Sequence, residues 1–437
     1  MDTTKQTRQI IVRLLNNLGS QKEVQQYLKR FSALETEKFA VVKVGGETLQ
    51  QDITALSSSL AFLQQVGLAP IIIHGAGPQL SQTLASEGIE FQVRDGLRVT
   101  TPEVLKIARR VFQTENLALV DALRDAGVRA TSITSGVFEA EILDREKYGM
   151  VGKITGVHLD LVRAALRSQS MPVISPFGET ADGQILNINA DMAANELVRA
   201  IQPFKIIFLT GTGGILDHDG NLISSINLST DYQYMMSSDW LHSGMRLKLE
   251  QIHDMLLDLP HSSSVSITHP AMLAKELFTY QGSGTLVRYG ENIHTFTSWT
   301  DVDQGRLRKL LESSFQKKLT EDYFENNELA AVFVSDSYRS AAVILQEQGI
   351  VRMDKFSVTE EAQGEGLGRS VWEQVRHTFP AMYWRARPGN PINQFYFQQA
   401  DGFIKGRQWN VFWYGVSDYQ QIGELVERAH STPATLL

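Results

Sequence analysis

Five short apolar runs between residues 37 and about 287 constrain the fold of this part of the chain most strongly. None of them alternates with polar residues, and such strands are typical of a sheet covered on both faces. Longer segments with helical spacing separate the runs, which predicts parallel strand–helix–strand units. The runs are KFAVVKV, APIIIHG, PVISPF, KIIFLT and SVSITHP. We therefore expect an α/β domain built on a mainly parallel sheet.

The length of the chain, 437 residues, exceeds what one hydrophobic core usually supports, so we expect more than one domain. Apolar residues at helical spacing predict a helical arm over 1–36, before the sheet domain of 37–287. The polar, aperiodic segment RYGENIHTFTSWT predicts a linker over 288–300. Over 301–437 the order changes to a helix, three strands, a glycine-rich loop, a helix and a strand, which predicts a second α/β domain.

Charge and composition narrow the classes of partner. A net charge of −8 gives no electrostatic reason to expect nucleic-acid binding. The chain contains no cysteine, which excludes disulfides, thiolate nucleophiles and cysteine-based zinc sites, and we assign no metal ligands. No apolar run approaches the roughly 20 residues that span a bilayer, and the first residues lack the apolar core of a secretory signal. We therefore expect a cytoplasmic protein without membrane or nucleic-acid partners.

Glycine-rich turns follow the first two predicted strands. Lys43, Gly45 and Gly46 lie at the end of the first strand, where α/β sheets bind ligands. Adjacent glycines let backbone N–H groups approach an anion, and the following helix directs its positive end there. The second turn, HGAGP at 74–78, repeats this pattern. For the first turn alone, a tight strand–helix connection beside a surface lysine is an equally good interpretation.

Six motifs occur in the order seen in amino-acid kinases, and over 37–287 the chain resembles the N-acetylglutamate kinases most. They are KVGG, HGAGP, GLRVT, ILNINADMAANELV, GMRLK and ELFTYQGSGT. The resemblance implies that Lys43 and Lys248 stabilise the transferred phosphoryl group of ATP and that Asp191 orients the lysines. Gly45 and Gly46 would contact the phosphates. The residues implied to hold N-acetylglutamate are Ala76, Gly77, Arg98 and Asn187.

These residue types suit the phosphorylation of a carboxylate. With a pKa of about 4.3 the carboxylate is ionised at neutral pH, so the reaction requires no general base. It requires stabilisation of charge on the γ-phosphoryl group, usually with Mg²⁺. Asp191 also has a simpler explanation, as a negative charge at a helix N-terminus. The segment LTGTGGILD at 209–217 departs from relatives that carry an Asp-containing turn there, so the contacts to the nucleotide stay open.

A third glycine-rich loop, QGEGLGR, resembles the pyrophosphate-binding signature of the GCN5-related N-acetyltransferases (the GNAT fold). It lies between a predicted strand and a predicted helix, so consecutive amides would face an anion at the positive end of the helix. An ordinary glycine loop is the alternative. The acetyl-CoA contacts that the resemblance implies are Gln363, Gly364, Glu365, Gly366, Leu367, Gly368 and Arg369.

The segments MDKFSV (353–358) and YWRARPGNPINQFYFQQADGFI (383–404) resemble the acetyltransferase domain of vertebrate-type N-acetylglutamate synthases. The resemblance implies that Tyr396 is the general acid for the departing sulfur. It implies that Lys355 contacts glutamate or helps to deprotonate it, and that Arg385 and Asn390 bind glutamate. Tyr396 also fits an aromatic core cluster, and Arg385 fits an ion pair at the edge of a strand.

Together the two resemblances imply a bifunctional enzyme of arginine biosynthesis. It would acetylate L-glutamate with acetyl-CoA and phosphorylate N-acetyl-L-glutamate with ATP and Mg²⁺, which gives N-acetylglutamyl 5-phosphate. Two single-activity alternatives remain. One is a synthase whose kinase-like domain only senses arginine, and the other is a kinase with a non-catalytic acetyltransferase-like module.

Regulation and assembly follow from the same resemblance. Arginine-sensitive relatives carry an additional N-terminal helix, and Glu276 and Gly282 match the arginine contacts of the family. A carboxylate can bind a guanidinium in bidentate fashion. A local cap or salt bridge explains Glu276 equally well. We expect a homo-oligomer, either a dimer or a tetramer, with L-arginine as a candidate inhibitor.

Overall fold

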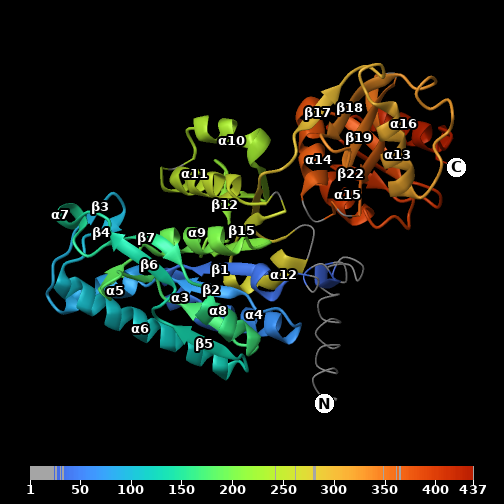
Figure 1. Ribbon diagram of the computed structural model, residues 1–437. Helices are drawn as coiled ribbons and strands as arrows, with labels where there is room; N and C mark the ends of the chain where they lie inside the picture. The colour runs from blue at the N-terminus through green and yellow to red at the C-terminus, as the bar shows by residue number, and fades with distance from the viewer. Residues whose placement is uncertain are drawn as a thin grey trace, which may run out of the picture. The chain divides into compact units, whose positions relative to one another are not determined.

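The computed structural model describes residues 24, 27–29, 31, 34–241, 243–260, 262–278, 282–347, 349–360, 362–363 and 366–436. The chain divides into two compact units, Met1–Tyr289 and Gly290–Leu437 (Figure 1). Most of the predicted helical arm lies outside the described residues. Among the residues described here, no helix has the length and apolar character needed to cross a membrane.

The five predicted apolar runs form adjacent parallel strands of one eight-stranded sheet in the first unit. They are β1 (Ala40–Val44), β2 (Ile71–His74), β8 (Met171–Ile174), β11 (Lys205–Leu209) and β15 (Ser264–Thr268). The full strand order is β14-β16-β15-β11-β1-β2-β8-β5, in which β16 runs antiparallel to β15. The remaining members are β5 (Ala130–Ile133), β14 (Ser225–Asn227) and β16 (Thr285–Arg288).

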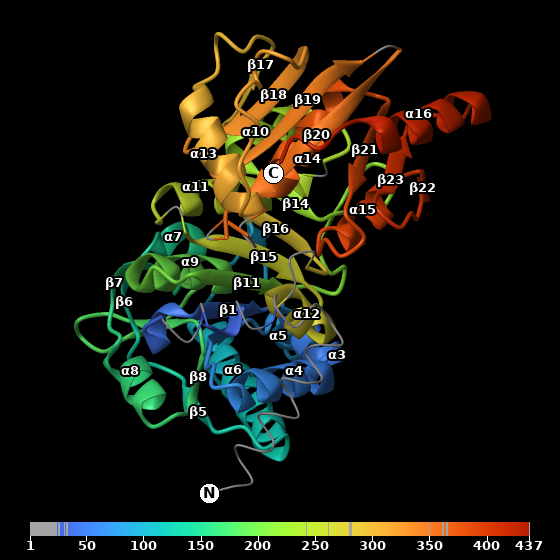
Figure 2. The same ribbon diagram turned by 90° about the vertical axis from the view of Figure 1, so that its right-hand side faces the viewer.

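The sheet is apolar on both faces because helices enclose it from both sides (Figure 2). Along β1, Val41 belongs to one hydrophobic cluster, and Val42 and Val44 belong to the other. This explains why the strand sequences do not alternate. The helices are α3 (Gly46–Gln51), α4 (Ile53–Gln65), α5 (Gly77–Ser86), α6 (Pro102–Asp125), α7 (Arg145–Tyr148), α8 (Asp160–Arg167), α9 (Ala190–Ile201), α10 (Leu228–Ser237), α11 (Ser243–Leu257) and α12 (Leu273–Phe278).

The first unit also contains three smaller sheets. A four-stranded sheet has the order β10-β9-β6-β7, and two hairpins are formed by β3 with β4 and by β12 with β13. Their bounds are β3 (Val93–Arg94), β4 (Leu97–Arg98), β6 (Phe138–Ile142), β7 (Gly152–Val157), β9 (Phe177–Glu179), β10 (Ile185–Asn187), β12 (Ile215–Leu216) and β13 (Leu222–Ile223). The strands β4 and β10 carry Arg98 and Asn187, so these small sheets position predicted substrate contacts.

The few described residues of the arm pack on the first unit itself. Val24, Tyr27, Leu28 and Phe31 are buried in the cluster on the α4 and α12 side of the sheet. The ring of Phe31 lies 5.7 Å from the ring of Phe278 in α12. The C-terminal part of the arm therefore contacts the last helix of this unit.

The second unit is built on a seven-stranded sheet with the order β17-β18-β19-β20-β21-β23-β22. Only the β20–β21 pair is parallel. The strands are β17 (Ile293–Phe296), β18 (Leu329–Ser335), β19 (Ser340–Glu347), β20 (Ile350–Val358), β21 (Met382–Ala386), β22 (Gly402–Ile404) and β23 (Asn410–Tyr414). The helices are α13 (Gln304–Phe315), α14 (Leu367–Thr378), α15 (Asn393–Gln399) and α16 (Tyr419–Ser431). The predicted fold class, two successive α/β domains, is confirmed.

The segment predicted as a linker, 288–300, contains the edge strand β17, which pairs with β18. Two of the four residues of β17, His294 and Thr295, are exposed, so the strand has no buried apolar face that a sequence pattern would reveal. The two faces of the seven-stranded sheet pack against separate hydrophobic clusters. The α14 side is lined by Met353, Phe356 and Trp384, and the α13 side by residues such as Val343.

Candidate active sites

Two lysines and a carboxylate meet at the carboxyl end of β1. The Lys43 Nζ lies 2.6 Å from an Asp191 oxygen in the first turn of α9. The Lys248 Nζ, on α11, lies 5.6 Å from the centre of the Phe208 ring, and Phe208 is the β11 neighbour of Lys43. Burial lowers the pKa of Lys248, repulsion by Lys43 lowers it further, and Asp191 opposes both. The structure thus brings all three together.

Lys248 differs from Lys43 in its partners. Within the described ranges, no carboxylate lies within ion-pair distance of the Lys248 ammonium. The helix directs this half-buried cation toward the same space as Lys43, so an excess of positive charge remains at the end of the strand. Such a site favours an anion with several negative oxygens, as a phosphoryl group has.

The glycine turns after β1 and β2 pack directly against each other. The Gly75 N–H donates to the Val44 carbonyl at 2.9 Å. A Cβ on Gly46 would lie only 2.8 Å from Gln79 Oε1 and 3.0 Å from the Gly77 nitrogen. Because no side chain fits there, the amides at the starts of α3 and α5 gather at one place, with Gly45 as the N-cap of α3 and Ala76 as the N-cap of α5.

Arg98 lies beside the second glycine turn. Its Nη2 donates to the Gly77 carbonyl at 3.2 Å and to Ser81 Oγ at 2.7 Å, and its guanidinium stacks on the Phe91 ring at 3.9 Å. Its Nη1 is buried and has no partner in the part of the chain that the structure describes. Burial lowers the pKa of Arg98. A buried, unpartnered guanidinium nitrogen is a ready donor for a carboxylate of a ligand.

Asn187 connects to the same region through Thr100. Its Nδ2 donates to Thr100 Oγ1 at 3.1 Å, and that hydroxyl donates to the Arg98 carbonyl at 2.8 Å. The structure therefore links Arg98 and Asn187, although they are 89 positions apart in the sequence. The side chain of Asn187 is half-buried on β10.

The segment 209–217 leads from β11 into the β12–β13 hairpin. The Asp217 carboxylate accepts backbone N–H groups of Asp219 at 2.9 Å and Asn221 at 2.8 Å, and these bonds lower its pKa. Asp217 therefore holds the hairpin turn. With His218 and Asp219 it forms a small exposed cluster, to which we assign no ion.

His74 is fully buried at the end of β2. Its Nε2 lies 3.1 Å from Asn116 Nδ2 and 3.3 Å from Ser175 Oγ. Burial lowers the pKa of His74 to about 4. This histidine is neutral at neutral pH and has a structural role, without contact to the lysine cluster.

Glu276 on α12 and Gly282 after it, the candidate arginine contacts, lie next to each other. The Glu276 Oε2 accepts the backbone N–H groups of Ser283 at 2.7 Å and Gly284 at 3.0 Å. A Cβ on Gly282, which has a φ of +61°, would lie 2.4 Å from the same oxygen. The carboxylate thus has the local capping role that the sequence left as an alternative, and its Oε1 has no partner among the described residues.

The predicted pyrophosphate loop connects β20 to α14. Gly366 is the N-cap of α14 and has a φ of +73°, and Leu367 is buried in the core. A Cβ on Gly368 would lie 2.6 Å from Val358 Cγ2, so the helix start approaches the strand closely. The Gln363 side chain donates to the Val358 carbonyl at 3.4 Å, and Arg369 pairs with Glu373 along α14. Gly364 and Glu365 lie outside the described residues.

The strands β20 and β21 separate beside this loop. They pair from Val351–Met382 to Met353–Trp384, whereas β20 continues to Val358 and β21 to Ala386 without further pairing between them. Tyr396 on α15 is buried on the α14 side, 5.6 Å from the Trp384 ring. Burial raises its pKa, so the phenol keeps its proton. In the described chain the Tyr396 hydroxyl has no hydrogen-bond partner, which leaves it available to a ligand.

Lys355 points to the other side of the sheet. A bulge in the β19–β20 pairing places Asp354 between residues that face Val343 and Ile344. The Lys355 Nζ donates to the Asp354 carboxylate and to the Thr435 hydroxyl, and lies 5.2 Å from the centre of the Tyr323 ring. Burial opposes ionisation of Asp354, but Lys355 and Arg352 outweigh it and hold the pKa of Asp354 well below its usual range. Burial lowers the pKa of Lys355, and Asp354 opposes that effect.

Arg385 lies on the same side of the sheet as Lys355. Its Nη1 donates to the Thr432 carbonyl at 2.6 Å and its Nη2 to the Pro433 carbonyl at 2.8 Å. Its guanidinium stacks on the Trp409 ring at 4.3 Å. Its hydrogen bonds within the described residues all go to backbone carbonyls, and no carboxylate among those residues lies at ion-pair distance from it. The strand-edge ion pair considered from the sequence is therefore not what holds Arg385.

Asn390 has a local structural contact. Its Oδ1 accepts the Ile392 N–H at 3.2 Å, and Asn393 Nδ2 donates to the Arg387 carbonyl at 2.8 Å. The two asparagines thereby shape the turn that leads into α15. Nothing in the described residues links Asn390 by a hydrogen bond to Lys355 or Arg385.

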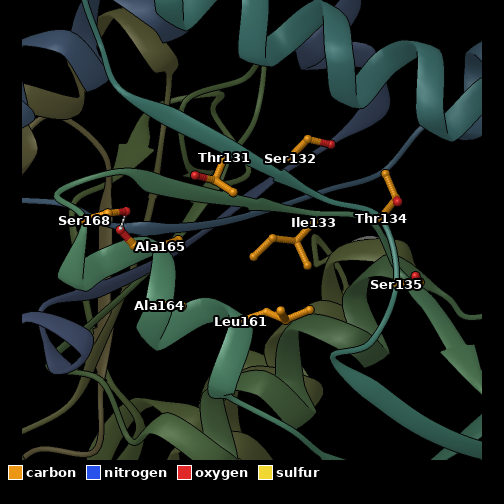
Figure 3. A pocket seen from close by; sticks show the side chains of 9 residues that line it. All are labelled: Thr131, Ser132, Ile133, Thr134, Ser135, Leu161, Ala164, Ala165 and Ser168. Atoms are coloured by element: carbon orange, nitrogen blue, oxygen red, sulfur yellow. Dashed lines mark hydrogen bonds between the residues drawn. The ribbon is translucent and has the colours of Figure 1, made fainter.

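A separate hollow of about 470 Å³ lies between β5, at the edge of the first sheet, and α8 (Figure 3). Hydroxyl groups and small side chains line it, and Figure 3 shows Ile133 and Leu161 facing each other across it. None of the predicted site residues lines this hollow, so we assign it no part in the chemistry.

Several residues that contact these sites were not predicted from the sequence. Gln79 donates to the Gly46 carbonyl at 2.8 Å and so joins the two glycine turns. Its position directly after HGAGP, in the first turn of α5, was a usable signal. Trp409 and Thr435 gave no such signal, because they reach Arg385 and Lys355 from distant parts of the sequence.

Comparison with protein families divides the chain in the same way. The amino acid kinase family matches residues 38–258, which is just over half of the chain. The N-acetyltransferase domain of N-acetylglutamate synthase matches residues 294–432. The first match contains Lys43, Asp191 and Lys248 but ends before Glu276 and Gly282. The second contains Lys355, Arg385 and Tyr396 but ends before Pro433 and Thr435.

Relatives that match nearly the whole of this chain carry two different names. The acetylglutamate kinase of Xanthomonas campestris pv. campestris is 55% identical over 96% of this chain and all of that protein. The mitochondrial N-acetylglutamate synthase of Homo sapiens is 33% identical over 96% of this chain and 77% of that protein. A solved N-acetylglutamate synthase of Neisseria gonorrhoeae, complexed with coenzyme A and N-acetylglutamate, shares the fold with a TM-score of 0.58. It covers 90% of this chain and 97% of its own at 18% identity.

Proposed function

The chain belongs to the amino acid kinase family and carries the acetyltransferase domain of N-acetylglutamate synthases, and on that basis we propose that it catalyses two consecutive reactions of arginine biosynthesis. The first unit phosphorylates N-acetyl-L-glutamate with ATP, and the second acetylates L-glutamate with acetyl-CoA. The observation that supports this proposal most is the convergence of Lys43, Asp191 and Lys248 in the first unit of a chain whose second unit matches the acetyltransferase domain.

In the kinase unit, catalysis is electrostatic. Lys43 and Lys248 stabilise charge on the phosphoryl group in transfer, and the amides around Gly46 bind the phosphates. Asp191 holds Lys43 in place through their ion pair. Mg²⁺ bound with ATP supplies further neutralisation of the phosphate charges. Arg98, with its unpartnered Nη1, receives a carboxylate of N-acetylglutamate.

In the acetyltransferase unit, the neutral amine of glutamate attacks the thioester carbon of acetyl-CoA. The carbon–sulfur bond breaks, and the departing sulfur takes a proton from the Tyr396 phenol. The new amide nitrogen gives up its extra proton to solvent, and solvent returns a proton to the phenolate. The loop from Gln363 to Arg369 binds the pyrophosphate at the start of α14. On the opposite side of the sheet, Lys355 and Arg385 bind the carboxylates of glutamate. The Asp354 carboxylate accepts a hydrogen bond from Lys355 and so holds its Nζ at this site.

One experiment separates this proposal from the two single-activity alternatives. The purified full chain is incubated with labelled acetyl-CoA and glutamate without ATP, and then with N-acetylglutamate and ATP. We expect labelled N-acetylglutamate in the first reaction and an acyl phosphate, trapped by hydroxylamine, in the second. Acetylation alone indicates an arginine-sensing synthase, and phosphorylation alone indicates a kinase with an inert module.

We also propose that L-arginine binds at the end of the first unit. Glu276 lies beside Gly282, and the described residues of the arm pack on the same helix, α12. If so, millimolar arginine should inhibit at least one activity, and Glu276→Gln should relieve the inhibition without lowering the uninhibited rate. Calorimetry that detects no arginine binding to the intact protein would remove this site. Homo-oligomeric assembly and a cytoplasmic location stay predictions from the sequence.

A further inference from the structure

The C-terminal segment that follows α16 lies against both cations of the acetyl-acceptor site. Thr435 receives a hydrogen bond from Lys355, and Thr432 and Pro433 receive hydrogen bonds from Arg385. Lys355 also donates a hydrogen bond to Asp354. The other hydrogen-bond acceptors of these two cations belong to the end of α16 and the segment after it. Neither family resemblance nor spacing indicated this, because about 80 positions separate Lys355 from Thr435.

The segment has a fixed position of its own. The Thr435 carbonyl accepts the Thr320 N–H at 3.1 Å, and Leu436 forms an antiparallel bridge with Leu319. Leu436 also packs against the hydrophobic cluster under α13. Backbone pairing and apolar packing thus hold the Thr435 side chain over β20, independently of its contact with Lys355.

The hydroxyl of Thr435 completes a ring of three polar groups. It accepts a hydrogen bond from Lys355 Nζ and donates at 3.5 Å to Asp354 Oδ2, which also receives Lys355 directly. Tyr323 donates to the same carboxylate oxygen at 2.7 Å. A lysine ammonium has three donors on a flexible four-carbon stem, so two fixed acceptors restrict the direction of its third N–H.

We propose that Thr435 is a positioning residue of the acetyl-acceptor site, where its hydroxyl orients the Lys355 ammonium toward a carboxylate of the substrate. The carbonyls of Thr432 and Pro433 do the same for Arg385. The C-terminal segment is thereby a wall of the pocket for a dicarboxylic amino acid. This inference rests on the proposed acetylation of glutamate by the second unit.

The test is a pair of substitutions at one position. Thr435→Val keeps the shape of the side chain and removes the hydroxyl, and Thr435→Ser keeps the hydroxyl and removes a methyl group. Loss of a hydrogen bond to a charged group should raise the KM for glutamate roughly tenfold in Thr435→Val, with kcat nearly unchanged. Thr435→Ser should retain a KM close to that of the wild type. A chain that ends at Ser431 should show a still higher KM.

Two internal controls report on folding. The affinity for acetyl-CoA should be unchanged in all three variants, because the pyrophosphate loop lies on the other side of the sheet. Phosphorylation of N-acetylglutamate by the same preparations should also be unchanged, because the kinase site belongs to the other unit.

The outcomes distinguish the positioning role of Thr435 from the proposed acetylation of glutamate, on which it depends. If the wild type does not acetylate glutamate, both fail. If it does, an unchanged KM in Thr435→Val overturns the positioning role alone, and so does a Thr435→Ser variant that is as impaired as Thr435→Val. A lower KM in the truncated chain would mean that the segment obstructs the pocket rather than forming its wall.

Discussion

Lys248 in the first unit and Lys355 in the second are both lysines at a proposed substrate site, and they differ in how their charge is balanced. Among the described residues, Lys248 has no carboxylate at ion-pair distance and is repelled by Lys43. Lys355 is paired with a fully buried carboxylate, Asp354. The first arrangement keeps positive charge uncompensated until a ligand arrives, whereas the second fixes the direction of a cation in advance.

The difference follows from the chemistry proposed for each unit. Phosphoryl transfer to a carboxylate joins two anions, so its catalyst benefits from positive charge that the protein does not neutralise. Acetyl transfer to an amine creates no such concentration of charge. Its demands are an oriented acceptor and a proton donor for sulfur, and both are met by groups held in a buried network. Removal of a single group should therefore have its largest effect in the first unit.

The largest expected effect is on the lysine pair. Lys248→Ala and Lys43→Ala should each lower kcat for phosphorylation by about 10²–10³-fold, because each removes a donor to the transferred group. Acetylation of glutamate by the same preparations should remain at the wild-type rate. Lys153→Ala, at an exposed lysine on β7, is the matched control and should affect neither reaction. Phosphorylation at the wild-type rate in both site variants would show that the uncompensated charge is incidental.

The second effect is on the phenol in the acetyltransferase unit. Tyr396→Phe removes one hydroxyl and should lower kcat for acetyl transfer by roughly 10²-fold, within the range of general acid catalysis. The affinity for acetyl-CoA should be preserved, because the ring stays in the aromatic cluster. Tyr414→Phe is the control, since the Tyr414 hydroxyl lies in the same cluster but donates to the Phe379 carbonyl. Equal losses of kinase and synthase activity in Tyr396→Phe would instead assign Tyr396 to packing.

The two units also differ in how much of each site the sequence could predict. In the first unit, the two glycine turns follow β1 and β2, which are adjacent strands of one parallel sheet, and the carboxyl ends of such strands share an edge. The convergence of these turns beside Lys43 could therefore be expected from the sequence. Asp191, at the start of α9, and Lys248, on α11, could be placed there only by the family resemblance. The apolar runs predicted the sheet because a strand that is buried on both faces has a continuous apolar sequence.

In the second unit, the main contacts of the predicted residues come from elements without a sequence pattern. The bulge at Asp354 depends on pairing with β19, and the position of Thr435 depends on a bridge to Leu319. Asn390 was predicted as a substrate contact, yet its side chain contacts the backbone of its own turn. Contacts of this kind arise from tertiary packing, which spacing along the chain does not encode.

The smallest expected effect concerns acid stability and contrasts the buried groups of the two units. His74 is buried neutral, with a pKa of about 4 against an ordinary value of 6.5. Its contribution to stability is complete above pH 6.5 and is lost progressively as the pH falls toward 4. Asp354 has a pKa held below its ordinary value of 3.8, so its contribution is lost only below that value. Between pH 7 and 5.5, therefore, the titration of His74 should lower the free energy of unfolding of the first unit, whereas Asp354 should leave that of the second unit unchanged.

From the two pKa values of His74, the first unit should lose about 1.2 kcal/mol of unfolding free energy between pH 7 and pH 5.5. Hydrogen exchange of β1 and β2 should accelerate by roughly tenfold relative to pH 7 after correction for the intrinsic rate, whereas exchange of β20 and β21 should not. In His74→Gln, which has no titrating ring, the acceleration in the first unit should disappear. If β20 and β21 lose protection equally over this range, or if His74→Gln keeps the full acceleration, the buried neutral histidine is not what distinguishes the two units in acid.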